Sequence, residues 1–272
     1  MQEAKELHRK VVRKFQKRRI ITGGIDDIWA ADLLIMSQYA RQNRGYKYIL
    51  NVIDTFSKYL FAVPLKKKTG KESAEAFAGI IKNNKRCPTK LHVDRGKEFV
   101  NKDFEKMLKK HNILMYHTFN EEKSAIAERV NRTINEKLKL RFEVAQNHKW
   151  FDVLPKIVKE YNEQDIHRSI GTTPAKVTQS NEDEIREKLF PLDKFKLDKS
   201  TFRVGDPVRI PCYKNLFGNK YKRNWTKEIF YVTKVHLTDP ITYSIEDVNH
   251  EPILGHFYKQ ELLKTLKKFI PK

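Results

Sequence analysis

The sequence predicts an α/β domain built on a mixed five-stranded sheet flanked by helices, followed by a small all-β barrel. Two observations predict this fold class. In the first part of the chain, short runs rich in Ile, Leu, Val and aromatic residues follow one another across short turns and then alternate with helical patterns, which indicates three antiparallel strands and then two parallel ones. Beyond residue 200, short β-type runs are separated by Gly, Pro and Asn residues, a pattern typical of small barrels and sandwiches.

The first three strands are expected at residues 28–37, 46–54 and 59–65, where Ile, Leu, Val and aromatic side chains dominate. The polar stretch 55–58 supplies a turn between the second and third strands. After them a helix, a strand, a helix and a strand are expected at 72–83, 91–94, 101–111 and 114–118. Strands that alternate with helices are expected to pair in parallel on the same sheet.

A long amphipathic helix is expected at 124–148, because apolar residues recur there at close to helical spacing. These residues are Ile126, Val130, Ile134, Leu138 and Phe142. Another helix is expected at 150–164, and the Thr173-Pro174 step begins a shorter one.

Four short strands are expected in the barrel, at 203–211, 230–236, 242–248 and 253–258. The charged segment before them is interpreted as a linker. The chain is therefore expected to have five parts: a basic N-terminal arm at 1–24, a core domain at 25–182, a charged linker at 183–199, the barrel at 200–266 and a basic tail at 267–272.

The charge of the chain predicts a polyanionic partner, because 55 Lys and Arg against 34 Asp and Glu give a net charge of +21. Nucleic acid is the leading partner; a solvated basic surface or a ribosome-associated protein is the alternative. No apolar run is long enough to span a membrane, so a soluble protein with no membrane partner is expected. Cys87 and Cys212 lie far apart in unlike contexts, which argues for reduced thiols in an intracellular compartment.

The N-terminal arm is rich in Lys and Arg and ends at Gly23-Gly24. It is interpreted as a basic arm that precedes a domain and that could act as a nuclear import signal; a flexible tail is the alternative. A zinc finger is not supported there, because it needs spaced pairs of Cys and His ligands and the arm offers only His8.

Three acidic residues are candidates for chemistry. Asp32 lies inside an apolar run, where a carboxylate is costly unless a cation or several donors compensate it; an Asp at a strand end or bulge is the alternative. Asp94 closes a short strand before a Gly-containing turn, a place where open α/β sheets bind ligands and also where ordinary Asp turns occur. Glu128 lies about 200° around the long helix from Ile126 and points away from its core contact; a surface Glu favoured by the helix dipole is the alternative.

A polar and basic stripe follows Glu128 on the same side of the helix and suits a phosphate backbone. It consists of Asn131 or Arg132, then Asn135, then Lys139. Two divalent metal ions can activate a nucleophilic oxygen and stabilise the leaving oxygen in phosphoryl transfer, and such a pair of ions needs clustered carboxylates. Asp32, Asp94 and Glu128 would supply them from two strands and a helix.

An aromatic and basic loop in the barrel is a second candidate for nucleic-acid binding. Tyr221 and Trp225 lie there amid Lys220, Lys222, Arg223 and Lys227. Such a loop can stack on or grip nucleic acid; a Trp in a small core surrounded by solvated lysines is the alternative. Nothing in the barrel resembles a base-reading helix, so Lys222, Arg223 and Trp225 are expected to contact the DNA backbone with little sequence preference.

Four blocks of sequence resemble the integrase and transposase superfamily, which has an Asp, Asp, Glu active site on a ribonuclease-H-like fold. They are WAADL at 29–33, YILNVIDTFSKY at 48–59, VDRGKEF at 93–99 and ERVNRTI at 128–134. HRSIGTTP at 167–174 looks like the family's segment after the helix, and FRVGDPVR at 202–209 with GHFY at 255–258 is similar to the SH3-like barrel of integrases. In detail the chain resembles most the retroviral-type integrases of Maverick or Polinton transposons.

The resemblance implies a DNA integrase that trims element ends and joins them to target DNA. Asp32 would bridge two Mg²⁺ (or Mn²⁺) ions, Asp94 would hold one ion and Glu128 the other. The candidate DNA contacts near the site are Lys97, Arg132, Asn135 and Lys139. Asp54 is expected to be structural, because it has no counterpart in the triad.

The sequence departs from the family in two places. The segment between Asp94 and Glu128 is shorter than in the retroviral pattern, with NEEK at 120–123 in place of a Pro- and Gly-bearing stretch. Residues 1–24 do not resemble the family's N-terminal zinc-binding domain. The resemblance further implies double-stranded DNA as the partner, a homo-oligomer (dimer or tetramer), no small-molecule substrate and a nuclear location.

Two other functions fit part of the sequence. One is a catalytically inactive, host-adopted protein that binds DNA or chromatin. The presence of all three acids argues against it. The other is a nuclease acting on RNA and DNA hybrids, which shares the fold and the metals; the block beginning at Glu128 and the basic barrel favour the integrase over it.

Overall fold

The structure is a computed structural model that describes residues 1–18, 20–117, 125–191, 199–212 and 223–266. The chain divides into two compact units. The core unit is Ile20–Leu192, and the β-unit combines Met1–Arg19 with Asp193–Lys272. Within the described part of the chain, no helix is both long and apolar enough to cross a membrane.

The core unit is built on a five-stranded sheet in the order β3-β2-β1-β4-β5. The strands are β1 (Ile28–Ile35), β2 (Tyr48–Asp54), β3 (Leu60–Leu65), β4 (Lys90–Val93) and β5 (Leu114–His117). The first three pair antiparallel, and β1, β4 and β5 pair in parallel. This mixed sheet confirms the predicted fold class.

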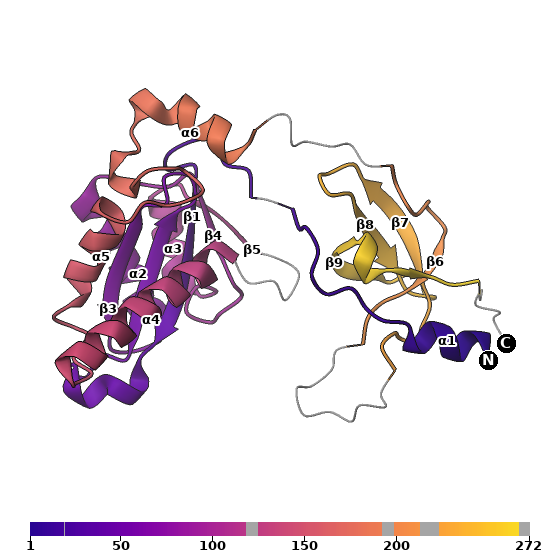
Figure 1. Ribbon diagram of the computed structural model, residues 1–272, viewed down its shortest axis with the longest axis horizontal. Helices are drawn as coiled ribbons and strands as arrows, with labels where there is room; N and C mark the ends of the chain where they lie inside the picture. The colour runs from indigo at the N-terminus through magenta and orange to yellow at the C-terminus, as the bar shows by residue number, and fades with distance from the viewer. Residues whose placement is uncertain (19, 118–124, 192–198, 213–222, 267–272) are drawn as a thin grey trace. The chain divides into compact units, whose positions relative to one another are not determined.

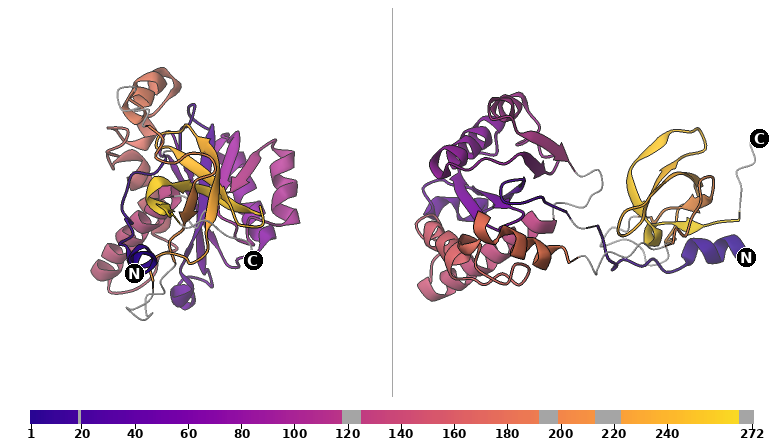
Figure 2. Two further views of the ribbon diagram at one scale, coloured as in Figure 1. Left: turned by 90° about the vertical axis from the view of Figure 1, so that its right-hand side faces the viewer. Right: turned by 90° about the horizontal axis from the view of Figure 1, so that it is seen from above.

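Two layers of helices cover the sheet, one on each face (Figures 1 and 2). On one face α2 (Gly70–Asn84) and α3 (Lys102–Lys110) bury apolar side chains against Trp29 and Leu91. On the other face α4 (Ala125–Ala145) and α5 (Leu154–Glu163) pack on Ala30, Ile49 and Ile53. Because side chains alternate between the two faces of a strand, residues 30, 32 and 34 of β1 all face α4 and α5.

The apolar period of α4 explains its place in the core unit. Val130, Ile134 and Leu138 are buried against the sheet, as the spacing predicts. Three short helical turns complete the irregular segments of this unit: η1 (Ser37–Gln42), η2 (Pro174–Lys176) and η3 (Gln179–Asn181).

The first half of the segment expected to be a linker forms a helix in the structure. Residues 182–189 form α6 (Glu182–Leu189), which belongs to the core unit. Its Ile185 is buried in a cluster with Phe56, Ile170 and Val177. Leu189 packs against the same cluster, so two apolar residues anchor this otherwise charged helix. Residues 192–198 lie outside the described part of the chain.

The β-unit contains a second, antiparallel sheet in the order β10-β6-β7-β8-β9. Its elements are β6 (Pro207–Arg209), β7 (Phe230–His236), β8 (Thr242–Glu246), β9 (Pro252–Tyr258), η5 (Lys259–Glu261) and β10 (Leu263–Lys264). Val208, Phe230, Val232, Tyr243 and Ile245 form its core.

The N-terminal arm belongs to this β-unit, and the flexible-tail alternative is therefore not what the structure shows. Its first residues form α1 (Gln2–His8), and Leu7 is buried in a cluster with Trp225 and Leu263. The backbone amides of Asn224 and Trp225 donate to the carbonyl of Leu7. In Figure 1 the indigo N-terminal segment runs along this sheet.

Candidate active site

The register of the central strands places Asp32 and Asp94 side by side. In the parallel pair β1–β4, Ala30 lies opposite His92. Asp32 lies two residues beyond Ala30 in β1, and Asp94 lies two residues beyond His92, directly after β4, so they share one level and one face of the sheet. Both are half-buried. Two carboxylates thus lie at the carboxyl end of β4, the kind of place where open α/β sheets bind their ligands.

Asp32 is held in place by its own strand and by α4. Its Oδ1 accepts a hydrogen bond from the backbone amide of Leu33 at 2.8 Å. Its Oδ2 accepts one from Nδ2 of Asn131 at 2.9 Å. Asn131 lies on the face of α4 that packs on the sheet, so the docking of this helix fixes the orientation of the Asp32 carboxylate.

Glu128 lies in the first turn of α4, one helical turn before Asn131, the residue that binds Asp32. Its side chain is exposed. Among the described residues, no three His, Cys, Asp or Glu side chains lie close enough together to hold a metal ion. The structure therefore brings Asp32 to Asn131 and aligns it with Asp94, but it does not close a cluster of all three acids.

The turn after β4 holds Asp94 and leads to a buried carboxylate, Glu98, that pairs with an exposed lysine. The amide of Gly96 donates to Oδ1 of Asp94 at 3.0 Å. Glu98 is 2 % exposed, and its carboxylate lies 2.9 Å from Nζ of Lys68. The hydrogen bond to Glu98, with the negative charges of Glu98 and Asp94, raises the pKa of Lys68. Lys68 and Glu98 were not predicted as site residues from the sequence, although an acid two residues after a turn glycine is a visible signal.

The donor set suits a hard divalent cation. Carboxylates from Asp32, Asp94 and Glu128 offer only oxygen atoms, which Mg²⁺ and Mn²⁺ prefer. The alignment of Asp32 with Asp94 places two of these donors on one face of the sheet end. The donor atoms and the positions of Asp32 and Asp94 therefore fit a divalent metal ion. That Glu128 joins them as a third ligand is a proposal.

Comparisons with known proteins agree with this arrangement. Residues 25–119 match the sequence model of the integrase core domain. This match spans β1 to β5 with α2 and α3, so the first part of the core unit is similar to the integrase core domain.

Two proteins similar to this chain have names that refer to transposons. An uncharacterized transposon-derived protein of Caenorhabditis elegans is 34% identical over 195 residues, which are 72% of this chain and 65% of that protein. A retrovirus-related Pol polyprotein from a Drosophila melanogaster transposon is 26% identical over 230 residues, 81% of this chain and 20% of the polyprotein. The chain thus spans less than two thirds of either relative.

A solved structure shares the fold over nearly the whole chain. The structure of the simian T-cell lymphotropic virus intasome in complex with a PP2A regulatory subunit contains a chain that matches with a TM-score of 0.69. The match covers 98% of this chain and 88% of that one at 13% sequence identity. At this identity the likeness shows the fold alone.

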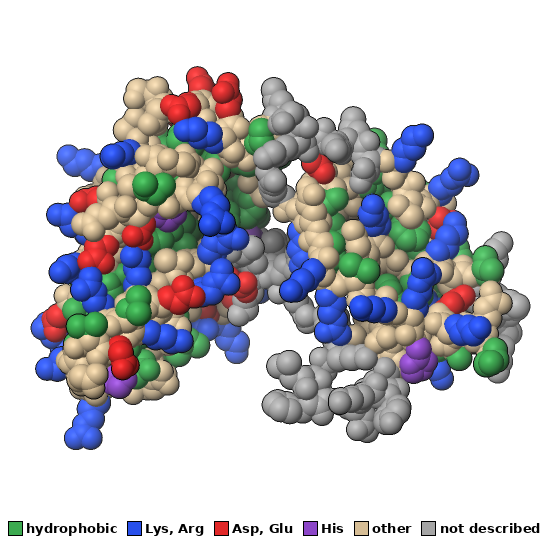
Figure 3. Space-filling model, viewed as in Figure 1, with side chains coloured by type: hydrophobic (Ala, Val, Ile, Leu, Met, Phe, Trp, Pro, Cys, Tyr) green, Lys and Arg blue, Asp and Glu red, His purple; other side chains and the backbone are tan. Residues whose placement is uncertain are grey.

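The expected DNA contacts near the candidate site lie at the surface or close to it. Lys97, Arg132 and Lys139 are exposed and Asn135 is half-buried. Glu128, Arg132, Asn135 and Lys139 follow one another at steps of four, three and four residues, so they form one stripe along α4. Figure 3 shows Lys and Arg side chains spread over the visible face of each unit.

The candidate contacts in the β-unit divide into three cases. Arg223 is exposed, as a backbone contact requires. Lys222 lies outside the described residues, as do Lys220 and Tyr221. Trp225 is only 3 % exposed, and its Nε1 donates to the carbonyl of Arg9 at 2.8 Å. Because α1 covers this ring, Trp225 has the core role that was the alternative, and the expectation of an exposed stacking residue is corrected.

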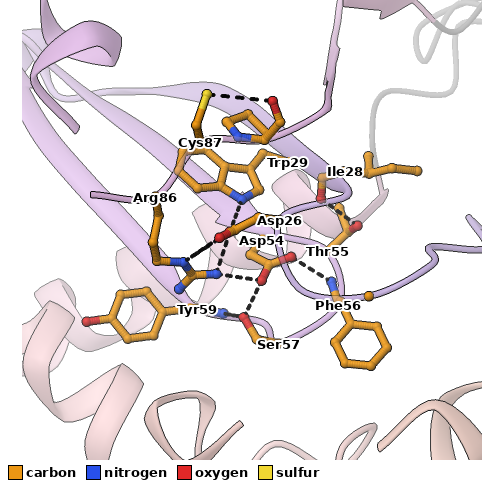
Figure 4. A network of polar contacts seen from close by, with 12 residues as sticks. Asp26, Ile28, Trp29, Asp54, Thr55, Phe56, Ser57, Tyr59, Arg86 and Cys87 are labelled. Carbon is orange, nitrogen blue, oxygen red and sulfur yellow. Dashed lines mark hydrogen bonds and ion pairs between the residues drawn. The ribbon is translucent and has the colours of Figure 1, made fainter. Parts of the chain in front are cut away.

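Asp54 lies at the other end of the sheet, opposite Trp29, in a network of polar contacts (Figure 4). Its Oδ2 accepts hydrogen bonds from Oγ of Ser57 at 2.5 Å and from Arg86 at 2.7 Å. The Arg86 guanidinium also binds Asp26. Burial raises the pKa of Asp54, while Ser57 and Arg86 oppose this shift. Asp54 therefore ties β2 to the loops around it, which agrees with the expected structural role.

Proposed function

We propose that this chain is a metal-dependent DNA integrase of a mobile element, which processes 3′ ends and transfers them into target DNA. One observation carries the proposal: Asp32 inside β1 and Asp94 directly after β4 lie side by side on the face of the sheet that α4 covers, in a chain whose residues 25–119 match the integrase core domain. The sequence blocks further support a relationship to Maverick or Polinton transposon integrases.

In this proposal Asp32, Asp94 and Glu128 hold two divalent ions. When bound, such ions activate the attacking oxygen of water or of a 3′-hydroxyl and stabilise the leaving oxygen. Asn131 fixes the Asp32 carboxylate through Oδ2. Lys97, Arg132 and Lys139 are exposed and would neutralise phosphates on either side of the reacting bond.

The proposed partner is double-stranded DNA, both as element ends and as target. A net charge of +21 supports this partner, and binding that depends on Lys and Arg should weaken steeply as salt concentration rises. Arg223 would add backbone contacts from the β-unit. We further propose a homo-oligomer, since two element ends must be joined together, and action in the nucleus, where target DNA lies.

A catalytically inactive DNA-binding protein is the second candidate. It is favoured by one observation: no three potential metal ligands lie together in the part of the chain that the structure describes. In this case the basic surface would bind DNA and the acids would be inert.

A strand-transfer assay separates the two candidates. The protein is incubated with duplex oligonucleotides and Mg²⁺ or Mn²⁺ and compared with Asp94→Asn, which keeps the size of the side chain and removes its charge. The integrase proposal predicts joined products with the native protein and a loss of at least about 100-fold in the variant, since transition-state charge stabilisation is the largest catalytic term. Equal activity in both proteins would overturn the metal mechanism; retained DNA binding without activity in either would favour the second candidate.

A further inference from the structure

A buried amide lies directly opposite Asp32 in the sheet. Asn51 is the antiparallel partner of Asp32 between β1 and β2, so their side chains are neighbours on one face. On the same face of β2, Ile49 and Ile53 are buried beneath α4. Asn51 is 1 % exposed. A polar side chain between two buried Ile residues is costly unless it is hydrogen-bonded, which calls for a function of this amide.

Asn51 is the first member of a hydrogen-bonded chain that ends at Asp32. Its Nδ2 donates to Oδ1 of Asn131 at 2.6 Å. Nδ2 of Asn131 in turn donates to Oδ2 of Asp32 at 2.9 Å. The three side chains come from β2, α4 and β1, so these hydrogen bonds join two strands to the helix that packs on them.

Asp32 determines which groups donate and which accept in this series of hydrogen bonds. An ionised carboxylate only accepts hydrogen bonds, so Asn131 must turn its NH₂ group toward Asp32 and its carbonyl toward Asn51. Asn51 must then donate, and its own carbonyl points away. That Oδ1 atom is buried and has no hydrogen-bond partner among the described residues. An unsatisfied buried carbonyl is the cost of presenting a donor to Asn131.

We propose that Asn51 is a positioning residue for the metal-binding carboxylate. It locks the amide of Asn131 in the orientation that holds Oδ2 of Asp32, while the Leu33 amide holds Oδ1. The plane of the Asp32 carboxylate is thereby fixed before a cation binds. This inference rests on the proposed function, because it assigns a role to Asn51 only if Asp32 binds metal.

A purely structural role makes a different prediction. If Asn51 only ties β2 to α4, its loss lowers the thermal stability of the protein and leaves cation binding unchanged. If it positions Asp32, its loss weakens cation binding as well. The shift of the thermal unfolding midpoint with increasing Mn²⁺ concentration measures this binding without any catalytic assay.

The test compares Asn51→Leu, which keeps the size and removes the donor, with a matched control. Asn162→Leu serves as the control: Asn162 is also buried, and its amide exchanges hydrogen bonds of 2.8 and 2.9 Å with the backbone of Leu60. It has no hydrogen bond with Asp32 or Asn131 that the described contacts show. Thermal unfolding is followed for the full chain at rising Mn²⁺.

The expected result is a separation of the two variants. Asn51→Leu needs about tenfold more Mn²⁺ than the native protein for the same stabilisation, whereas Asn162→Leu lowers the midpoint but keeps the native Mn²⁺ dependence. A native Mn²⁺ dependence in Asn51→Leu overturns the proposal. If the native protein itself is not stabilised by Mn²⁺ and transfers no strand, the proposed function fails and the inference with it; if it does both and the Asn51 variant matches it, only the inference fails.

A second variant covers the case in which Asn51→Leu does not fold. Asn51→Asp keeps the shape and polarity of the side chain but offers only acceptors, so Asn131 turns its NH₂ group away from Asp32. The added negative charge alone would tighten cation binding. Weaker Mn²⁺ dependence in this variant therefore supports the lost donor as the cause, and equal or tighter dependence contradicts the proposal.

Discussion

Lys58 carries the charge whose burial has the clearest consequence for stability. It lies in the turn between β2 and β3, where its Nζ donates to the carbonyl of Thr55. Desolvation by burial, with a contribution from the nearby Arg129, lowers the pKa of Lys58 from 10.5 to about 8, and Asp54 opposes the shift. The folded state thus loses this proton at a lower pH than the unfolded state does.

The sign of the effect follows from proton linkage. Between pH 8 and 10.5 the unfolded state holds more protons at this position, so Lys58 makes stability rise with pH over that range. In Lys58→Met we expect this rise to be reduced and the protein to be more stable than the native one at pH 7. Urea unfolding at pH 7, 8 and 9 of both proteins measures it; identical pH profiles would contradict the account.

The position of Asp32 could be predicted from the sequence, but its contacts could not. A carboxylate inside an apolar run is visible as an anomaly, and the anomaly locates the site. Its partners are not visible, because Asn51 and Asn131 reach it through strand pairing and helix docking. Asn131 was expected only as part of a polar stripe for DNA, whereas the structure turns it toward Asp32.

Secondary-structure elements followed their local patterns where one pattern dominated. The strands β1 to β3 and the helix α4 agree with the apolar runs and the helical period that predict them. The strand expected at 203–211 is shorter, only Pro207–Arg209. Before it, Gly205 adopts a φ of 86° and the amide of Arg203 donates to the Asp206 side chain at 2.9 Å, so a turn replaces the first half of the run.

Alanine substitutions at two glycines are expected to change the stability of the protein in opposite directions. Gly79 lies inside α2, and a Cβ there would meet no atom within 4 Å. Gly79→Ala should stabilise the protein by about 0.5–1 kcal/mol, the difference in helix propensity. At Gly96 a Cβ would lie 2.5 Å from Cδ of Glu98, so Gly96→Ala must displace the buried carboxylate from Lys68.

The expected loss in Gly96→Ala is about 1–3 kcal/mol, the cost of a buried charged group that loses its partner. Chemical unfolding of both variants beside the native protein measures the two changes. Stabilisation by Gly96→Ala, or destabilisation by Gly79→Ala, would show that the backbone around these residues differs from the one described.

The first residues of the chain pack into the β-unit together with its C-terminal part. Arg209 is fully buried in the β-unit, where its guanidinium donates to the carbonyls of Thr226 and Lys227 and meets the carboxylates of Glu3 and Glu6. A charge of this kind is tolerated inside a protein only when it is paired and hydrogen-bonded. The basic composition of the arm hid this role, because Leu7 and the two acids are few among many cations.

Truncation of Leu7 tests the role of the arm. Leu7 is buried against Trp225 and Leu263, so Leu7→Ala should destabilise the β-unit by about 2–3 kcal/mol and leave the core unit unchanged. Val12→Ala is the control, since Val12 is 53 % exposed. Amide hydrogen exchange should speed up around Trp225 and β10 in the first variant only; equal exchange in both variants would mean that the arm does not support this unit.

The central claim, that Asp32, Asp94 and Glu128 together hold the catalytic metal, is tested most directly by anomalous diffraction from crystals of the protein soaked in Mn²⁺. The account predicts manganese peaks within about 2.0–2.6 Å of carboxylate oxygens of Asp32 and Asp94, with Glu128 drawn in to complete the site. Crystals of a protein active in strand transfer that bind manganese elsewhere, or bind none between these carboxylates, would contradict it.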